Sequence, residues 1–515
     1  MFSADERRRL LEMDIDLGGS GESELWRAFS VVYNCLTLPS DSLSLSYPMH
    51  DASGAAQRPA FVVNRASAVF SLQPEQADMD RLRTEAIKPA LLLAANSLHG
   101  GGTYAASAAQ FISSYAPERL KVLEKAANMS RGSLSRSSVR ALYGDKLRLS
   151  ASRIDKFASC RFAYFMQYAL RAKPYAPAQF TAPEMGTFMH TILEKVSREV
   201  SSMGGYKNVD DETLIRLTDG FIAEYIRVNL NDFKEKSKRF EHLFRRLQSS
   251  VRQVVLDLAG ELRSSSFEPL SFELDFSSTP ELPPVRLGSG EDSLELTGVA
   301  DRVDGWLHDG KLYLRIVDYK TGQKQFQLSD VLYGMNLQML LYLFSLGENG
   351  SALYGREIVP AGVLYVPARS PSIPSDTDMD DEALQKEKAE KLRRSGLILD
   401  DPAVIAAMEN SDMPKYLPVR VKRGADTGSF ASAERMGALA RHIDETLCRM
   451  ASELRGGSIA ADPYYAGQQS SACTNCDYFE ACHFIDGENG ESMRIMQKLP
   501  ATKVWSILEG GEENG

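Results

Sequence analysis

The sequence predicts an α/β protein with a mixed central sheet flanked by helices. Residues 294–320 contain two segments in which apolar and polar side chains alternate, as they do in paired strands. Residues 358–366 form a further segment of strand length, whereas residues 183–200 repeat apolar side chains at the spacing of an amphipathic helix. Strands and helices that alternate along a chain favour a sheet with helices packed against it.

Composition indicates a soluble, cytoplasmic protein with more than one domain. A chain of 515 residues is too long for one ordinary core. It has no unbroken apolar stretch of about 18 residues that could span a membrane, and its charged start is unlike a signal peptide. The net charge of −10 argues against indiscriminate binding of polyanions by the whole surface, but it is compatible with a local basic groove.

Residues 1–145 are predicted to form the first domain. Its expected elements are an amphipathic helix near Leu10, an apolar run at 26–38, a short strand at 43–47, a helix at 79–95 and a Ser-, Arg- and Gly-rich linker at 121–144. No glycine-rich loop ending in Gly-Lys-Ser or Gly-Lys-Thr occurs in the sequence. We therefore expect no ATP to be bound by the P-loop route.

Residues 146–495 are predicted to form the second domain. It opens with serines suited to a helix N-cap and with an aromatic helix that carries Cys160. The helix at 183–200 follows, with His190 at the edge of its apolar stripe, where a single histidine is more often a satisfied boundary residue than a ligand. Residues 207–263 are expected to be helical and basic, and a strand at 269–276 contains Glu273.

The segment at 294–320 is predicted to be a β-hairpin with an Asp-Gly turn after His308. In its second strand Leu312, Leu314 and Ile316 share a face with Asp318 and Lys320. Unpaired charge is costly away from water, so this face needs an explanation. Either Asp318 and Lys320 pair on a surface hairpin, or Asp301 and Asp318 hold a divalent cation with Lys320 near an attacked phosphate.

The remaining elements are expected in a simple order. Residues 329–346 predict a helix on which Gln338 and Tyr342 share a face, either as a polar edge or as part of a site. The other expected elements are the strand at 358–366, a Ser- and Asp-rich insertion at 371–382, a helix at 433–454, and a C-terminal helix with a frayed tail at 496–515.

Three cysteines form a C-x2-C-x5-C cluster: Cys473, Cys476 and Cys482. In a cytosolic chain such a cluster indicates metal or redox chemistry rather than a structural disulfide. Three thiolates require a fourth ligand, and the candidates are His483, Cys448, Cys160 and Cys35. Spacing alone leaves zinc and an iron-sulfur centre both open.

These motifs occur in an order that resembles the RecB-like branch of the PD-(D/E)XK nucleases, and most closely the C-terminal half of the AddB component of AddAB helicase-nucleases. The phrases KFASCRFAYFMQYALRAKP, GVADRVD and VDYKTG carry the likeness, which covers roughly residues 149–490. The resemblance implies that His190, Asp301 and Asp318 hold a catalytic Mg²⁺, with the Tyr319 carbonyl in the shell. Such a shell can also accept Mn²⁺.

The resemblance also assigns roles to the remaining residues. Lys320 would orient the attacking water, Gln338 and Tyr342 would contact substrate or brace the site, and Glu273 would have a minor role. Cys160, Cys473, Cys476 and Cys482 would ligate a structural [4Fe-4S] cluster, which leaves Cys448 and Cys35 spare.

The implied function is a DNA exonuclease module that degrades a single strand, the 5′-ended one, delivered from a duplex end by an AddA-like helicase-nuclease partner during double-strand break repair. Residues 1–145 are similar to part of an inactivated superfamily 1 helicase, with Leu38 where an arginine is usual, so the chain is expected to be a fragment of a longer subunit. Two alternatives stay open: a non-catalytic DNA-binding scaffold with an iron-sulfur staple, and a stand-alone iron-sulfur exonuclease.

Overall fold

The chain forms two compact units, Met1–Ala127 and Asn128–Gly515. The computed structural model describes residues 9–13, 15, 21–50, 55–75, 78–99, 101–127, 130–173, 182–229, 238–280, 282, 286–287, 294–322, 325–369, 371, 381–411, 414–422, 424–467 and 470–510. Within these residues no helix combines the length and apolarity that crossing a membrane requires.

The first unit is helical. Its helices are α2 (Gly21–Thr37), α3 (Phe61–Phe70), α4 (Met79–Arg83), α5 (Ile87–Asn96), α6 (Gly102–Tyr115) and α7 (Pro117–Ala127). A small core joins α5 to α6 through side chains such as Leu93, Ala105 and Ile112. The prediction of a strand at 43–47 is wrong. In the described part of this unit, the extended chain near these residues forms only an isolated bridge between His50 and Ala56.

The division between the units falls inside the segment predicted as a linker, but that segment is largely helical. It contains the end of α7 and all of α8 (Arg136–Tyr143), which begins at a Ser135 N-cap and buries Val139. Helix α8 packs against α19 (Ala433–Arg455) of the second unit. The structural division therefore lies before the boundary expected at residue 145.

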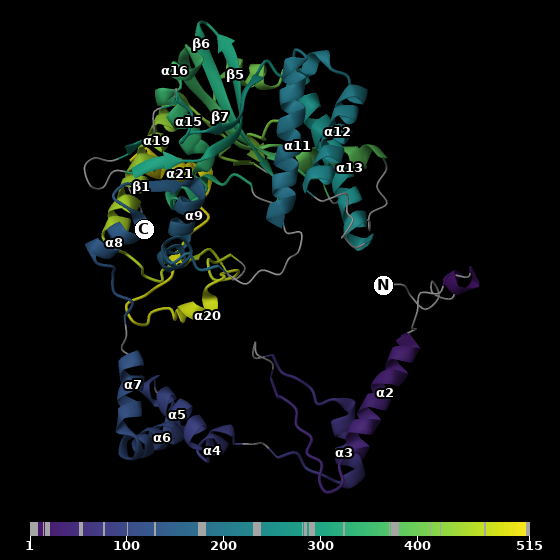
Figure 1. Ribbon diagram of the computed structural model, residues 1–515, viewed down its shortest axis with the longest axis vertical. Coiled ribbons are helices and arrows are strands. Elements are labelled where there is room, and N and C mark those ends of the chain that lie inside the picture. Colours follow the sequence, from purple (N-terminus) through teal and green to yellow (C-terminus); the bar gives the residue numbers. More distant parts are fainter. Residues whose placement is uncertain are drawn as a thin grey trace. The chain divides into compact units, whose positions relative to one another are not determined.

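A six-stranded mixed sheet organises the second unit and confirms the predicted fold class (Figure 1). Its order is β11 (Phe430–Ala431), β8 (Ser395–Leu399), β7 (Glu357–Pro367), β6 (Lys311–Lys320), β5 (Val299–His308) and β2 (Glu268–Asp275). The pairs β6–β7 and β8–β11 are parallel, and the other pairs are antiparallel.

Helices cover both faces of this sheet. On one face α11 (Ala182–Ser202), α12 (Asp211–Asn229) and α13 (Lys238–Ser264) pack against β6 and the end of β7, with Val317 and Tyr319 in the shared core. On the other face lie α9 (Ala151–Ser159), α15 (Gln338–Asn349), α18 (Pro402–Met408), α19 and α21 (Ala501–Leu508). Trp505 of α21 is 1% exposed, so this helix belongs to the core of the unit.

The predicted hairpin is present as β5 and β6. Asp309 and Gly310 both have positive φ, 49° and 77°, as a two-residue turn of this kind requires. The first predicted strand is divided in two, because β4 (Leu294–Thr297) leaves the sheet to pair with β1 (Leu147–Ser150). Gly298 makes the break with φ of 152°, and a Cβ added there would overlap the Tyr342 hydroxyl.

Two predicted helices are also divided. The helix expected at 329–346 becomes α14 (Leu328–Leu332) and α15, because Gly334 and Asn336 have positive φ and the Asn336 N–H donates to Asp155 at 2.8 Å. The helix expected to carry Cys160 ends at Ser159, and α10 (Arg161–Tyr164) starts after it. Cys160 itself is extended, with φ −166° and ψ 126°. Most of the insertion expected at 371–382 lies outside the described residues.

Candidate active site

Strands β5 and β6 separate at one end of the sheet, and this fork gathers the candidate residues. Arg302 and Val317 form the last pair of the β5–β6 ladder. Beyond that pair, Asp301 lies on β5, while β6 continues beside β7 through Asp318 to Lys320. The fork therefore brings together acidic and basic side chains from two strands that are paired elsewhere.

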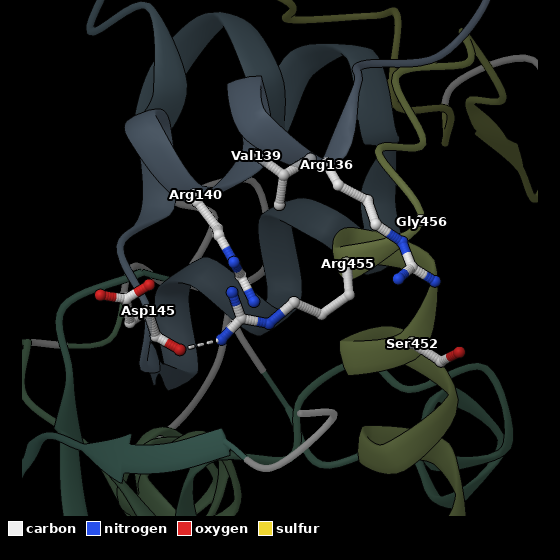
Figure 2. A pocket seen from close by; sticks show the side chains of 7 residues that line it. All are labelled: Arg136, Val139, Arg140, Asp145, Ser452, Arg455 and Gly456. Atoms are coloured by element: carbon white, nitrogen blue, oxygen red, sulfur yellow. Dashed lines mark hydrogen bonds between the residues drawn. The ribbon is translucent and has the colours of Figure 1, made fainter. Parts of the chain in front are cut away.

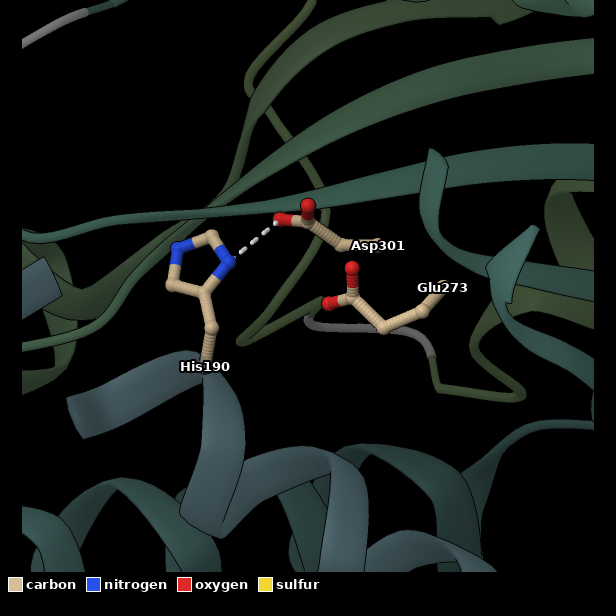
Figure 3. Close-up of side chains that lie close together, drawn as sticks. All are labelled: His190, Glu273 and Asp301. Carbon is tan, nitrogen blue, oxygen red and sulfur yellow. Dashed lines mark ion pairs between the residues drawn. The ribbon is translucent and has the colours of Figure 1, made fainter. Parts of the chain in front are cut away.

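His190 of α11, Glu273 of β2 and Asp301 of β5 converge at this fork (Figure 3). One ligand atom from each of the three lies within 4.8 Å of the others. The His190 Nδ1 atom is 3.3 Å from the Asp301 Oδ2 atom. The apolar stripe of α11 explains the position of His190. Phe188, Met189 and Ile192 are buried, and they hold His190 at the edge of the packed face of the helix.

The backbone of Tyr319 completes the framework. Its N–H donates to Asp301 Oδ2 at 2.9 Å, and its carbonyl oxygen lies 2.9 Å from His190 Nε2. Both ring nitrogens of His190 thus face oxygen atoms, an arrangement that favours the doubly protonated ring. Burial alone lowers the pKa of His190, but Asp301, the Tyr319 carbonyl and Asp318 together raise it. A cation bound here would take the place of a ring proton.

The carboxyl groups at the fork repel one another. Burial, followed by the charges of Asp301 and Glu194, raises the pKa of Glu273 to about 7. Burial and then Asp301 raise the pKa of Asp318 to about 6, although Lys320 opposes this shift. Several half-buried acids in mutual repulsion form a site in which a divalent cation relieves an excess of negative charge. The residues present fit a hard cation such as Mg²⁺.

Asp318 and Lys320 lie beside the three-residue cluster rather than within it. Lys320 Nζ is 2.6 Å from Asp318 Oδ2, and it also lies 5.5 Å from the centre of the Tyr365 ring. Asp318 is 5% exposed and Lys320 24% exposed, so their ion pair is largely buried rather than on a free surface. The charge of Asp318 adds to the contributions that raise the pKa of His190.

Glu273 has a more central place than the sequence indicated. In the β2–β5 ladder it falls opposite Asp301, between the pairs Phe272–Arg302 and Leu274–Ala300. Its φ of 49° is in the left-handed region, which is strained for a glutamate and is a feature often found at functional sites. In the sequence, Glu273 is recognisable only as a single acidic residue in the middle of a predicted strand. Its position opposite Asp301 depends on how β2 pairs with β5, which the local sequence does not determine.

Gln338 and Tyr342 lie one turn apart on α15, and the Tyr342 hydroxyl lies against Gly298 just before β5. Burial raises the pKa of Tyr342 to about 12, and Gln338 and the Val299 backbone, which lie beside its hydroxyl, oppose this shift. The Tyr342 ring stacks on Phe276 with centroids 4.7 Å apart. Tyr342 therefore lies beside β5 at Val299, two residues before Asp301.

The four cysteines that the resemblance singles out line one small cavity: Cys160, Cys473, Cys476 and Cys482. Neither Cys448 nor His483 lines it, and Cys35 lies in the other unit. The Arg131 guanidinium lies 3.5 Å from Cys482 Sγ, and backbone N–H groups of Phe162 and Ala163 face Cys160. Four thiols that line one cavity beside N–H donors suit a metal or iron-sulfur group, because such donors stabilise thiolate sulfur, but no three of the four sulfur atoms lie within 4.8 Å of one another.

Fold and site together define a class: an α/β enzyme core with an imidazole and carboxyl groups at the end of a mixed sheet. The PD-(D/E)XK nuclease superfamily matches the chain over residues 148–483, and the chain belongs to this superfamily. The predicted likeness to AddB is also confirmed. The chain is 31% identical over 539 residues to a subunit of the ATP-dependent helicase/deoxyribonuclease of Clostridium botulinum strain Hall.

The corresponding subunits of Clostridium perfringens (strain ATCC 13124) and Ruminiclostridium cellulolyticum are 27% and 28% identical. These alignments cover 99–100% of this chain and 46–47% of the relatives. The chain therefore spans about half the length of the curated relatives that it matches. The superfamily match places the nuclease domain inside this shared half.

Proposed function

We propose that this chain is the nuclease part of a helicase-nuclease subunit and that it hydrolyses phosphodiester bonds of single-stranded DNA. The convergence of His190, Glu273 and Asp301 beside the Asp318–Lys320 pair is the observation that carries the proposal. The relatives' description as helicase/deoxyribonuclease subunits supports DNA as the substrate.

Each residue of the candidate site has a role that follows from its chemistry. His190, Asp301 and Asp318 would hold Mg²⁺, with Mn²⁺ as a substitute, and the Tyr319 carbonyl or the Glu273 carboxylate would complete the oxygen set. A divalent cation supplies charge stabilisation at the phosphate and acidifies water. The Lys320 ammonium, placed beside Asp318, orients the attacking water and offsets the negative charge that develops on the phosphate oxygens. Gln338 and Tyr342 keep the β5 segment in position.

A cavity of about 960 Å³ has Lys320 in its lining and is a candidate place for the DNA strand. Basic side chains outnumber acidic ones in its lining: Lys320, Arg369, Lys391, Arg393 and Lys422 against Glu387 and Glu390. Lys391 is paired with Glu387 at 2.9 Å and Lys320 with Asp318 at 2.6 Å, which leaves Arg369, Arg393 and Lys422 against Glu390 in the lining. Positive charge next to a cleavage centre favours a single strand that is held by its phosphates.

The four cysteines would bind a [4Fe-4S] cluster with a structural role. Cys160 lies between α9 and α10, whereas the other three lie near α20 (Phe479–Cys482) at the far end of the matched region. A group bound to all four would join the two ends of the nuclease domain. The first unit would be the remnant of an inactivated helicase domain, and an AddA-like partner would deliver the 5′-ended strand during double-strand break repair.

Magnesium-dependent degradation of end-labelled single-stranded DNA tests the proposal. We expect the wild-type chain to shorten the strand progressively, and Asp318→Ala to abolish cleavage while it leaves the fold intact. Glu357→Ala, an exposed change on β7, is the control and should cleave normally. Equal cleavage by wild type and Asp318→Ala, or none by wild type with the cluster intact, would leave the non-catalytic scaffold as the better hypothesis.

A further inference from the structure

Arg131 lies in the segment that leads into α8, before the first residue of the superfamily match, yet its side chain reaches the cysteine cavity. The guanidinium donates to the carbonyl oxygen of Cys482 and lies 3.5 Å from the Cys482 Sγ atom. It also lies over the ring of Phe162, 4.1 Å from the ring centre. Cys482 and Phe162 both line the cavity and come from opposite ends of the matched region. One side chain therefore contacts both parts of the chain that form the cavity.

Glu491 fixes the direction of this guanidinium. Its Oε1 atom accepts from Arg131 Nε at 2.5 Å and from the Ala461 N–H at 3.0 Å. The side chains of Arg131 and Glu491 are only 19% and 11% exposed, so this ion pair holds its geometry better than a pair on the free surface does. Glu491 takes the Nε donor, whereas Nη2 faces the carbonyl and the sulfur of Cys482.

The backbone that follows Arg131 is attached to the loop after α19. Ser133 forms an isolated antiparallel bridge with Ser458, and the Leu134 N–H donates to the Gly457 carbonyl at 2.9 Å. Gly457 has a φ of 76°, and a Cβ added there would overlap the Leu134 backbone. Glycine thus permits a close approach that another residue would prevent. The segment presents Arg131 to the cavity from a fixed backbone.

We propose that Arg131 is a positioning residue for the cysteine site, which retains the bound metal group by holding Cys482 in place and by offsetting the negative charge of its thiolate. Thiolates from four cysteines carry more negative charge than a zinc ion or an iron-sulfur core neutralises. A cation beside one sulfur stabilises the bound state, and groups that contact the ligands in this way have large effects on metal affinity. The proposal rests on the assignment of the cysteines under the proposed function, but it does not depend on the chemistry at the fork.

The test measures how fast a metallochromic chelator removes the bound group from the full chain. Arg131→Gln removes the charge, and we expect it to lose the group about tenfold faster than the wild type, or more. Arg131→Lys restores the charge without the planar fork of donors, so it should recover part of the difference. If the group is an iron-sulfur cluster, its midpoint potential should become more negative in Arg131→Gln and return toward the wild-type value in Arg131→Lys, because a nearby cation favours the reduced state. A purely structural contact would not follow the charge in this way.

Glu491→Gln is a second variant, which keeps the charge of Arg131 but weakens the contact that directs it. It should also release the group faster than the wild type, and it serves as the test if Arg131→Gln does not fold. Arg136→Gln is the matched control and should release the group at the wild-type rate. Arg136 is exposed on α8 and lines a separate cavity, whose described lining contains no cysteine (Figure 2).

A wild-type release rate in either Arg131→Gln or Glu491→Gln would overturn the proposal. Equal acceleration in Arg131→Gln and Arg131→Lys would overturn it as well, since packing rather than charge would then retain the group. A wild-type chain without any bound metal would remove the cysteine assignment and this proposal with it. Loss of DNA cleavage in a chain that keeps its metal group would contradict the proposed cleavage alone.

Discussion

Tyr319 serves the candidate centre through its backbone and a buried charge network through its side chain. Its hydroxyl accepts from Arg302 Nη1 at 2.7 Å, and Arg302 pairs with Asp304 at 2.7 Å. The network continues through buried ion pairs among Asp304, Arg315, Glu261, Arg394 and Asp257. Paired charges in a core are costly to break, because removing one member leaves another buried alone. The network therefore fixes the strand that presents the Tyr319 N–H and carbonyl groups to Asp301 and His190.

At the residue scale, Glu273 gives a sharp test of the centre. Glu273→Gln keeps the shape of the side chain and removes its charge, so the site should bind a cation less tightly. We expect the affinity for Mn²⁺ to fall about 10-fold to 100-fold, with a parallel loss of cleavage when metal is limiting. Titration calorimetry with Mn²⁺ measures the affinity, and the end-labelled DNA assay measures cleavage.

Glu268→Gln provides the control for this change, because Glu268 lies on the same strand and is exposed. It should bind Mn²⁺ as the wild type does. If Glu273→Gln also retained the wild-type affinity, Glu273 would not be part of the cation site, and the three-residue cluster would be a packing feature.

Much of the candidate site could be predicted from local sequence, and the rest depended on tertiary register. Charge at the end of an apolar strand face singles out Asp318 and Lys320 in the sequence, and the spacing of Gln338 and Tyr342 places them on one side of a helix. The proximity of His190 to Asp301 came from the resemblance, since no local pattern relates α11 to β5. The position of Glu273 opposite Asp301 follows from how β2 pairs with β5, and no local pattern predicts that pairing.

At the element scale, the break between β4 and β5 sets the direction of the strand that carries Asp301. Gly298 has φ of 152°, and an added Cβ would overlap the Tyr342 hydroxyl. We expect Gly298→Ala to destabilise the second unit by about 2–5 kcal/mol, from backbone strain and overpacking together. Cleavage should fall even under conditions in which the protein stays folded, because Asp301 is three residues away. Urea unfolding and the DNA assay measure the two effects.

Gly220→Ala is the comparison for this prediction. Gly220 lies inside α12 with nothing within 4 Å of an added Cβ, so alanine there should raise stability by about 0.5–1 kcal/mol through helix propensity. Full stability and activity in Gly298→Ala would mean that Tyr342 moves without cost, and the bracing role of α15 would be contradicted.

The element predictions failed where side chains from distant segments interrupt a local pattern. The sequence of residues 329–346 is apolar at helical spacing, yet Asp155 and Asp330 bind Asn336 and stabilise a turn inside it. The chain at Cys160 likewise leaves the helix, and its thiol lines the cavity shared with Cys473 and Cys476. In both places a tertiary interaction overrides helix propensity.

At the scale of the whole molecule, the four cysteines come from the beginning and the end of the nuclease domain. Cys160 and Cys473 lie at opposite ends of the matched region, and both line one cavity. A group that bridges them closes a very long loop of chain. In the entropic treatment such a closure stabilises the folded state most, because it restricts the unfolded chain.

Cys160→Ser should therefore lose both the bound metal group and part of the stability of the second unit. We expect iron content and the brown thiolate-to-iron absorbance to disappear, with a loss in the free energy of unfolding of up to about 5 kcal/mol. Cys448→Ser should retain both, because Cys448 does not line the cavity. A colourless wild type that contains zinc would assign the set to zinc instead. If Cys160→Ser retained the wild-type iron content and stability, Cys160 would not be the fourth ligand. The cavity would then hold its cluster without the residue that links the two ends of the domain.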